Sequence, residues 1–433
     1  MNDNRAGVLG MRFYRFLGGA ALAAYAPFAL VRSLTGRRRL GDVAGRLGRL
    51  PYPDLDGGIW IHAVSVGEVG VAATLLTALA GRAEGRRLGL SVTTAAGREL
   101  AQRIVPPGVP VFAFPFDLAG PVERALSRVR PGLVLLTETE LWPLFLDRAA
   151  ARGIPVALVN GRISERSYPR YRRLRRWFGR ALDRVSLFLM QSGEDARRLQ
   201  DLGVPPSRIR TMGNVKYDLP VAPPFADGER LERMAGGRAV LVAASTAEGE
   251  EETILTALKS LSPRPLLVIA PRRPERFDDV ARRVEKASLA LARRSADGEV
   301  ERPDVYLLDT IGELASAYTH ATLAFVGGSL VPKGGHNPIE AWAAGVPVVV
   351  GPHTENFREI TERGESLEIV TRVADGPDLA RALAAALADD GELDRRGAAA
   401  RRFVSSNRGS ADATVREVLA LLPPSASRRG AAG

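Results

Sequence analysis

Residues 327–340 read GGSLVPKGGHNPIE, and this stretch decides the fold. The apolar run Ala321 to Val326 precedes it and predicts a buried strand. The two leading glycines favour a sharp turn with exposed backbone N–H groups, and the Asn-Pro pair favours the start of a helix that runs through Ala344. A strand, a glycine-rich turn and a helix N-terminus together predict an anion-binding site. A glycine-rich connection before a well-capped helix is the alternative.

The length and composition indicate a globular protein with two large domains. The chain has 433 residues, of which 45% are hydrophobic and 25% charged, and a single core rarely extends over so many residues. The absence of cysteine excludes disulfides and thiolate metal sites. The four histidines form no HExxH motif or other metal-ligand spacing, so we expect no protein-held metal and no cofactor.

The net charge of +11 is concentrated in two patches. Residues 1–50 carry nine arginines against two acidic residues, and residues 162–184 also carry nine against two. Such patches favour anionic partners, among which nucleic acid, anionic lipid headgroups and acidic substrates all qualify. An arginine-rich composition without a binding role is the alternative.

The first patch surrounds a candidate membrane anchor. Phe16 to Val31 is an uncharged stretch of sixteen residues, shorter than the roughly 20 of a comfortable transmembrane helix. Four arginines follow it within residues 32–39, which favours a cytoplasmic C-terminal side. Pro27 argues against cleavage after the preceding Ala-Tyr-Ala. We expect residues 1–35 to form an uncleaved anchor or an interfacial helix, with a buried helix of a soluble protein as the alternative.

Beyond the anchor, short apolar runs alternate with helical patterns, as in parallel α/β folds. The expected strands of an N-terminal domain, residues 36–219, are 59–66, 88–93, 109–114, 133–137, 155–160 and 186–191. A proline-rich linker follows at 220–227. The expected strands of a C-terminal domain, residues 228–424, are 239–244, 265–270, 305–308, 321–326 and 346–350. Two parallel-sheet domains of this kind bind ligands at the carboxyl ends of their strands.

Carboxylates follow two strands of the first domain. Glu68, in HAVSVGEVG, stands in the first turn of the next helix, where the helix dipole would keep it ionised and weaken it as a base. Such a residue can be a general base or only a helix-start residue. TETELWP at 137–143 adds Glu138 and Glu140, of which we expect one to face inward; Glu140 on a solvated helix start is the alternative.

In the second domain we expect the acidic run at 248–252 to be a solvated first turn. Arg272 follows a strand and suits a phosphate contact, with a surface loop as the alternative. Lys216, in GNVKYD, is a cation just before the linker.

These segments together resemble the bacterial 3-deoxy-D-manno-octulosonic acid (Kdo) transferases of lipopolysaccharide synthesis. The resemblance spans almost the whole chain and is carried by HAVSVGEV at 62–69, TETELWP at 137–143, NGRISERS at 160–167, GNVKYD at 213–218, STAEGEEE at 245–252, PRRPERF at 271–277 and the stretch from 327 to 357. It implies a GT-B fold, with two Rossmann-like domains facing a cleft, behind an N-terminal membrane-anchor helix.

The resemblance also implies an activity and its site. Kdo would pass from CMP-Kdo to a lipid A precursor, lipid IVA, with inversion and without a metal, at the cytoplasmic face of the inner membrane. Glu68 would be the general base, and Glu138 and Lys216 would stabilise the transition state. The implied CMP-Kdo contacts are Pro271, Arg272, Ile311, Gly312, Glu313, Gly327, Gly328, Ser329, Asn337, Pro338, Ile339 and Glu340. The implied partners include anionic inner-membrane lipids and no nucleic acid.

The sequence departs from the family pattern where Ala247 and Arg273 replace two usual histidines, and where Leu144 follows ELWP in place of asparagine. These changes leave details of donor and acceptor binding open. One rival interpretation is a GT-B enzyme that uses another nucleotide sugar. A second rival is a basic nucleic-acid-binding protein, against which stands the absence of interleaved aromatics or a zinc module.

Overall fold

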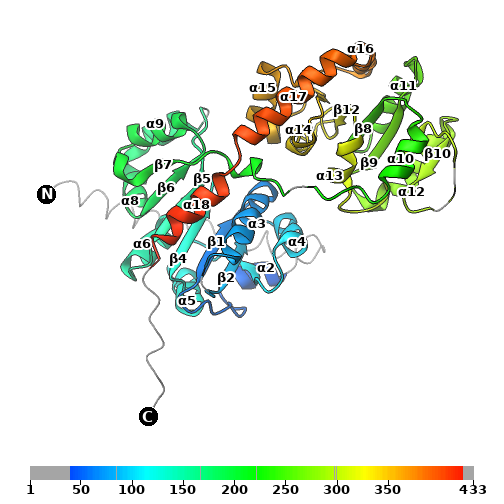
Figure 1. Ribbon diagram of the computed structural model, residues 1–433. Helices are drawn as coiled ribbons and strands as arrows, with labels where there is room; N and C mark the ends of the chain where they lie inside the picture. Colours follow the sequence, from blue (N-terminus) through cyan, green and yellow to red (C-terminus); the bar gives the residue numbers. More distant parts are fainter. Residues whose placement is uncertain are drawn as a thin grey trace. The chain divides into compact units, whose positions relative to one another are not determined.

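The computed structural model describes residues 40–83, 85–165, 167–220, 222–296, 298 and 300–422. The expected anchor, residues 1–35, lies outside these ranges. Within them, no helix combines the length and the apolar character that crossing a membrane requires. The chain forms two compact units (Figure 1): one runs up to Asp218 and resumes at Arg408, and the other is Leu219–Asn407.

The first unit is built on a parallel sheet of seven described strands in the order β3-β2-β1-β4-β5-β6-β7. Its strands are β1 (Ile59–Ala63), β2 (Leu88–Val92), β3 (Val111–Ala113), β4 (Leu133–Thr137), β5 (Val156–Gly161), β6 (Leu187–Met190) and β7 (Ile209–Thr211). The central strands β1, β2, β4 and β5 are buried throughout, which explains their continuous apolar runs.

Helices cover both faces of this sheet. They are α2 (Leu40–Arg46), α3 (Val66–Ala80), α4 (Ala95–Ile104), α5 (Ala119–Val129), α6 (Pro143–Ala151), α7 (Tyr168–Arg173), α8 (Arg175–Asp183), α9 (Gly193–Asp201) and α18 (Ser410–Leu419). Helices α3, α4 and α18 share one hydrophobic core with the sheet, and α5, α6, α8 and α9 share the other. The unit therefore has three layers.

The second unit repeats the plan with the order β10-β11-β9-β8-β12-β13-β14, also parallel. Its strands are β8 (Val240–Thr246), β9 (Leu266–Pro271), β10 (Leu291–Arg293), β11 (Val305–Leu307), β12 (Leu323–Val326), β13 (Val348–Val350) and β14 (Val370–Arg372). Its helices are α10 (Gly228–Ala235), α11 (Glu251–Ser260), α12 (Phe277–Lys286), α13 (Leu314–Ala317), α14 (Ile339–Ala344), α15 (Arg358–Ser366), α16 (Gly376–Leu387) and α17 (Asp390–Ser406).

The prediction of two parallel-sheet domains is confirmed. Every expected strand is present, and among the described strands only β7, β10 and β14 were not predicted. Each of the three has only three residues and lies at a sheet edge. So short a segment shows no period that would distinguish it from a loop.

The last helix differs from the expected domain ranges. The sequence predicts residues 228–424 as the second domain, but α18 belongs to the first unit. It lies along α3 (Figure 1) and buries Ala411, Val415 and Val418 in the core beneath. An apolar helix face shows that a helix is buried without showing which core buries it, which is why the sequence could not place α18.

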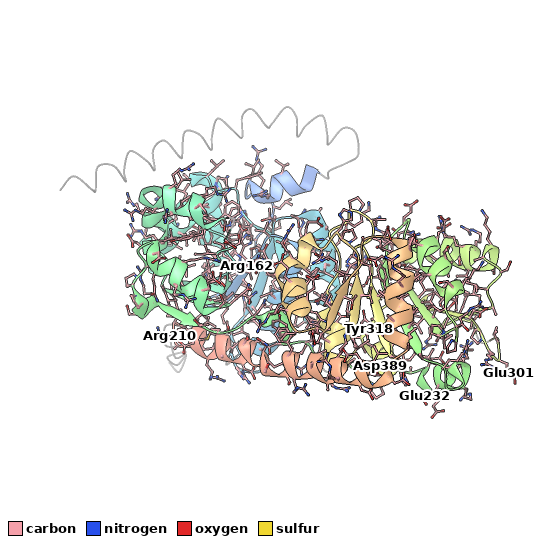
Figure 2. The ribbon with its side chains drawn as sticks, turned by 90° about the horizontal axis from the view of Figure 1, so that it is seen from above. Arg162, Arg210, Glu232, Glu301, Tyr318 and Asp389 are labelled. Atoms are coloured by element: carbon pink, nitrogen blue, oxygen red, sulfur yellow. The ribbon has the colours of Figure 1, made fainter. Side chains whose placement is uncertain are left out.

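Two carboxylates fix α18 on the first unit. The Asp218 carboxylate accepts hydrogen bonds from the backbone N–H groups of Gly409 and Ala411, at 2.5 and 2.6 Å. Glu417 lies 4.0 Å from the Nε atom of Arg210, which stands on the edge strand β7 (Figure 2). The start of α18 is thus bound to Asp218, the last residue of the first segment of this unit.

Val415→Ala should lower the free energy of unfolding of the first unit by about 2 kcal/mol, because it removes two buried methyl groups and leaves a cavity against α3. Urea denaturation followed by circular dichroism measures the change. Arg416→Ala, at an exposed position of the same helix, is the matched control and should shift the transition little. Equal effects of both substitutions would contradict the packing of α18 on this core.

Candidate active site

In both sheets the strand order reverses next to the first strand, and such a switch point is where open parallel sheets bind ligands. In the first unit the reversal lies between β1 and β4. Glu68 follows β1 on α3, and Glu138 follows β4 directly. The two carboxylates singled out in the sequence therefore stand at the same edge of one sheet.

Glu68 is held by four hydrogen-bonding groups and is 5% exposed. Its Oε2 atom accepts from the Val64 N–H at 2.9 Å and lies 2.9 Å from the Thr137 hydroxyl. Its Oε1 atom accepts from the Ser65 N–H at 3.2 Å and from the Ser65 hydroxyl at 2.8 Å. Ser65 caps α3 in return, so the pair forms a capping box that fixes the rotamer of Glu68.

The environment of Glu68 corrects one step of the sequence argument. We expected the helix dipole to keep this carboxyl ionised and weak as a base. Burial instead raises its pKa, the nearby charge of Glu138 adds to the rise, and hydrogen bonds from Val64, Ser65 and Thr137 only partly oppose it. A raised pKa makes the ionised carboxylate a stronger base than an exposed glutamate.

Glu138 and Lys216 form an ion pair beside Glu68. The Lys216 Nζ atom lies 2.9 Å from Glu138 Oε1, and the two side chains are 21% and 24% exposed. Glu138 has a φ of 53°, a left-handed conformation that is costly for a residue other than glycine. The predicted catalytic residues Glu68, Glu138 and Lys216 are thus brought together within one unit.

Asn160 positions the short helical turn Val215–Tyr217 that carries Lys216. Its Oδ1 atom accepts the Val215 N–H at 3.0 Å, and Asn214 accepts the Lys216 N–H at 3.0 Å. Asn160 is 1% exposed and also adopts a φ of 53°. This role of Asn160 could not be predicted from the sequence, since only the folded sheet brings residue 160 to residue 215.

Glu140 is a third carboxyl of this group, and it is not on a solvated helix start. It is half-buried, and burial together with the charges of Glu68 and Glu138 raises its pKa to about 7. Part of the signal was present in the sequence, because Glu138 and Glu140 alternate directly after a strand. Three carboxyls and one lysine therefore share this edge of the sheet.

In the second unit the reversal lies between β8 and β12, and the glycine-rich segment 327–340 follows β12. A Cβ atom on Gly327 would lie 2.7 Å from the Ser245 carbonyl oxygen and 2.8 Å from Glu250 Oε2, so only glycine fits there. Gly328 has a φ of 68°. The sequence prediction of a tight turn at these two glycines agrees with this geometry.

The N–H groups of that turn do not face a ligand, which corrects the expected anion cradle. Those of Gly328, Ser329 and Leu330 donate to the carboxylate of Glu250 at 2.7, 3.0 and 2.9 Å. The Gly327 N–H donates to the carbonyl of Ala244 at 2.8 Å. A protein carboxylate occupies the place that the sequence assigned to a phosphate.

The acidic run at 248–252 is accordingly not a solvated first turn. Glu250 and Glu251 are both fully buried. Glu251 forms a two-pronged ion pair with Arg276 at 2.5 and 3.1 Å, which ties α11 to the turn before α12. Glu248 and Glu252 are exposed, as expected.

Three of the predicted nucleotide contacts and one histidine lie near one another after β9 and β12. Pro271 is buried at the end of β9, and Arg272 next to it is exposed and pairs with no carboxylate of the described chain. Burial lowers the pKa of His336 to about 4, and the positive charge of Arg272 lowers it further. Burial raises the pKa of Glu340, and the charge of Arg272 partly opposes that rise. Among these four residues, Arg272 is the exposed cation available to bind an anion.

Apart from Ser329, the remaining predicted CMP-Kdo contacts lie at the start of α14 and in the loop 311–313. The expected helix start is displaced by one residue: the N-cap of α14 is Pro338 and the helix begins at Ile339, while the side chain of Asn337, one residue before the N-cap, accepts the Ile339 N–H at 3.1 Å. Ile311 is 75% exposed, and Gly312 beside it has a φ of 92°. Glu313 pairs with Arg294 at 3.0 Å through both carboxylate oxygens.

Ser329 was expected to contact the ligand, but its side chain is buried and bonded to the backbone. It is fully buried, and its hydroxyl donates to the Val326 carbonyl at 2.6 Å and accepts the Gly351 N–H at 2.9 Å. Ile339 is also fully buried. In the described part of the chain no group of histidine and carboxylate side chains is arranged to hold a metal ion.

Two parallel-sheet units with polar side chains at each switch point define the fold class as GT-B. The solved glycosyltransferase of kitacinnamycin has the same fold, with a TM-score of 0.53 and 18% identity over 85% of this chain and 99% of its own. The calicheamicin glycosyltransferase CalG4 superimposes with a TM-score of 0.51 and 17% identity, over 85% and 99% of the two chains.

Sequence relatives define the family within that class. A family model described as 3-deoxy-D-manno-octulosonic-acid transferase (kdotransferase) matches residues 38–219. The 3-deoxy-D-manno-octulosonic acid transferase of Bordetella pertussis is 39% identical over 86% of this chain and 89% of its own length. The enzyme of the same name from Haemophilus influenzae is 34% identical over 91% and 93%. The chain belongs to the Kdo transferase family.

The carboxyl cluster predicts a linked titration. Glu68→Gln should lower the pKa of Glu140 from about 7, because the substitution removes a negative charge that disfavours ionisation of Glu140. Carbon-13 NMR of labelled glutamate side chains measures both proteins. The Glu99→Gln protein, changed at an exposed position on α4, should keep the wild-type value. A pKa of Glu140 that does not move would place Glu68 and Glu140 too far apart to interact.

The Glu250 contacts predict a local effect on the glycine-rich turn. In Glu250→Gln, amide hydrogen exchange of residues 328–330 should accelerate about tenfold, because an amide replaces a charged acceptor of their N–H groups. Mass spectrometry after deuterium labelling measures the rates. Glu252→Gln, whose side chain is 72% exposed, is the control. Equal protection in both variants would mean that Glu250 does not hold the turn.

Proposed function

We propose that this protein transfers Kdo from CMP-Kdo to the lipid A precursor lipid IVA, with inversion at the transferred carbon and with Glu68 as the general base. One observation carries the assignment of the base: Glu68 is a nearly buried carboxyl with a raised pKa at the β1–β4 switch point of a Kdo transferase family member. The names of the relatives support the transferred sugar.

The proposed chemistry is a single displacement. A hydroxyl of the acceptor gives its proton to the Glu68 carboxylate while its oxygen bonds to C2 of Kdo, and the bond from C2 to the phosphate oxygen of CMP breaks with its electron pair. CMP leaves as the anion, and attack opposite to the leaving group inverts C2. The capping box holds Glu68 in one rotamer, so little reorganisation is needed when the hydroxyl arrives.

Lys216 and Glu138 have a positioning and electrostatic role in this proposal. Lys216 is oriented by its 2.9 Å contact with Glu138, and the turn that carries it is fixed by Asn160. A cation at this edge would stabilise negative charge that develops in the transition state. The charge of Glu138 in turn contributes to the raised pKa of the base.

For the donor, Arg272 is the proposed phosphate contact. Its guanidinium is exposed and pairs with no described carboxylate, so no internal ion pair must break when a phosphate binds. The Glu340 carboxyl, in the first turn of α14, is the proposed acceptor for ribose hydroxyls. The glycine-rich turn contributes its shape, because Glu250 already occupies its N–H groups.

We further propose that the enzyme acts at the cytoplasmic face of the inner membrane. Support comes from the sequence of residues 1–35 and from the arginines of residues 162–184, which favour anionic lipid. The proposed acceptor is itself a lipid, so an enzyme held at the membrane surface would meet it there.

Glu68→Gln should reduce the rate of Kdo transfer by roughly 100- to 10,000-fold, the usual effect of losing a general base, and leave CMP binding intact. The assay contains CMP-Kdo generated in place and a tetraacylated lipid A precursor, and calorimetry measures CMP binding. Glu99→Gln is the matched control and should keep wild-type turnover. Turnover of Glu68→Gln close to wild type would mean that another group is the base.

A further inference from the structure

The carboxylate of Glu68 is surrounded by as many hydrogen-bond donors as it can accept. A carboxylate has about four lone-pair positions, two on each oxygen. The Val64 N–H and the Thr137 hydroxyl occupy those of Oε2 at 2.9 and 2.9 Å. The N–H and the hydroxyl of Ser65 occupy those of Oε1 at 3.2 and 2.8 Å. An incoming hydroxyl can therefore give its proton to Glu68 only if one of these donors leaves or passes the proton on.

Three of the four donors are unsuited to passing a proton on. The N–H groups of Val64 and Ser65 are backbone amides, which are too weakly acidic to relay a proton. The Thr137 side chain is fully buried, and its hydroxyl also lies 2.8 Å from the His62 carbonyl oxygen. Its proton therefore has two acceptors inside the protein and no contact with solvent.

The fourth donor, the hydroxyl of Ser65, belongs to an exposed residue. It donates to Glu68 Oε1 at 2.8 Å and accepts the Glu68 N–H at 3.4 Å. A hydroxyl has one proton to donate and two positions at which it accepts, so one accepting position of Ser65 is left. A Cβ atom on Gly67 would lie 3.9 Å from the Ser65 hydroxyl oxygen, and no side chain of another described element would come within 4 Å of it. The space beside this hydroxyl is therefore open.

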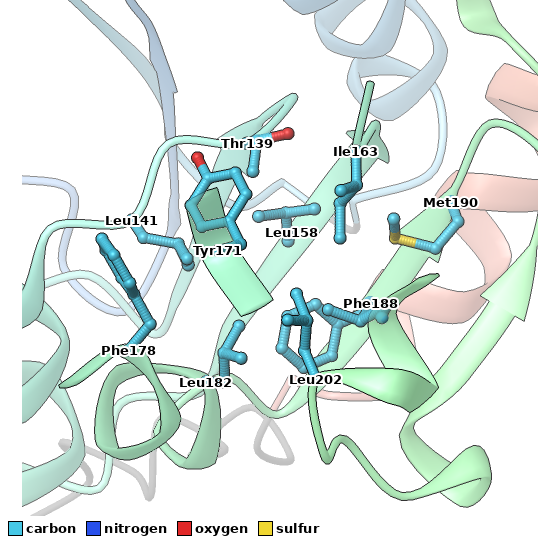
Figure 3. Close-up of a pocket in the computed structure, with 11 residues that line it drawn as sticks. Thr139, Leu141, Leu158, Ile163, Tyr171, Phe178, Leu182, Phe188, Met190 and Leu202 are labelled. Carbon is cyan, nitrogen blue, oxygen red and sulfur yellow. The ribbon is translucent and has the colours of Figure 1, made fainter. Parts of the chain in front are cut away.

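Another hydroxyl near the carboxyl cluster leads into the core instead. Thr139, one residue after Glu138, donates its hydroxyl proton to the backbone carbonyl of Arg162. The side chains that share the space behind it, between β5, β6, α7 and α8, are apolar except that Thr139 and Tyr171 carry hydroxyls (Figure 3). Of the hydroxyls bonded to Glu68, that of Ser65 is the one on an exposed residue.

We propose that Ser65 is a catalytic residue that relays the proton of the acceptor hydroxyl to Glu68. The Ser65 hydroxyl oxygen accepts the acceptor proton while its own proton moves to Oε1 of Glu68. The electron pair of the broken acceptor O–H bond becomes available for the new bond to the sugar carbon. Ser65 ends the step as a neutral hydroxyl and Glu68 as a neutral carboxyl. This inference rests on the proposed function, which supplies the base and the acceptor.

A second serine of the same unit provides a matched comparison. Ser192 is the N-cap of α9, where its hydroxyl accepts the Asp195 N–H at 3.1 Å and donates to the Asp195 carboxylate. The other oxygen of this carboxylate accepts the Ile163 N–H at 2.7 Å. Ser192 therefore has the same capping role as Ser65 and lies on a helix that carries none of the predicted catalytic residues.

Removing the hydroxyl tests the relay. Ser65→Ala should lower kcat roughly 10- to 100-fold, because water only partly replaces a positioned relay group. The comparison is made at a pH high enough to ionise Glu68 in both proteins, and the KM for the tetraacylated precursor should change little. Ser65→Thr keeps a hydroxyl and should retain most of the activity. Ser192→Ala loses a similar cap and should lower the melting temperature with wild-type turnover.

Direct transfer from the acceptor to Glu68 predicts the opposite result. Without the Ser65 hydroxyl, one position on Oε1 becomes free, so kcat of Ser65→Ala would stay at the wild-type value or rise, which would overturn the relay. If Ser65→Ala does not fold, Ser65→Gly replaces it, because glycine is nearly as good an N-cap as serine and also lacks the hydroxyl.

The number of protons in motion is a second readout that a capping role would not change. Single-turnover rates of the wild type are measured in mixtures of H₂O and D₂O. A relay moves two protons together, so the rate should fall along a curve as the deuterium fraction rises. A straight line would indicate one moving proton and overturn the relay.

The hydrogen bond itself is measured without any transfer. The Ser65 hydroxyl lowers the pKa of Glu68, so Ser65→Ala should raise that pKa further, as carbon-13 NMR of labelled glutamate detects. An unchanged pKa would mean that the two groups are not in contact and would overturn the relay.

Failure of the relay and failure of the proposed function give different results. Full turnover of Ser65→Ala with an inactive Glu68→Gln would overturn the relay and keep Glu68 as the base. Transfer from another nucleotide sugar, with the same loss in Ser65→Ala, would keep the relay and contradict the assignment of Kdo as the transferred sugar.

Discussion

Backbone N–H groups beyond the carboxyl end of a parallel strand have no ladder partner, and a buried one must find an acceptor elsewhere. In both units a buried glutamate that follows the first strand supplies it. Glu68 accepts from Val64 and Ser65 in the first unit, and Glu250 accepts from Ala247 and from three residues after β12 in the second. The loops at both switch points depend on these two carboxylates.

The two glutamates differ in what their other contacts allow. Glu250 is fully buried and its two oxygens accept four backbone N–H groups, so it has no lone pair left for a ligand in a favourable direction. Glu68 accepts only two N–H groups and shares its oxygens with the hydroxyls of Ser65 and Thr137, which can rotate. Burial and the nearby charge of Glu138 disfavour its ionisation. Both glutamates accept backbone N–H groups after a strand, but all the oxygens of Glu250 are occupied in this way, whereas those of Glu68 remain available for proton transfer.

Much of the fold could be predicted from the sequence, because the buried central strands are continuous apolar runs and the turns carry glycine and proline. The exceptions have physical reasons. β7, β10 and β14 are too short to show a period. Glu68, Glu138 and Lys216 could be named as candidates because each stands next to a strand or the linker in a motif that resembles the family's. The partner of the glycine-rich turn was missed because Glu250 precedes Gly328 by 78 residues and looks, in sequence, like any exposed acidic helix start. Arg272 and Glu313 were both expected as contacts of CMP-Kdo, yet of the two only Glu313 forms an ion pair within the described chain, with Arg294.

The position of α18 has a consequence for how the protein is made. The ribosome releases residues 40–218 first, but the core under α3 still lacks Ala411, Val415 and Val418 at that stage. The second unit is one continuous segment, Leu219–Asn407, and can complete its own core as soon as it emerges. The unit that is synthesised first is therefore completed after the second unit, and until α18 has emerged from the ribosome it exposes an apolar strip along α3. Nascent chains of this protein should need a chaperone at that strip for longer than the order of their domains would suggest.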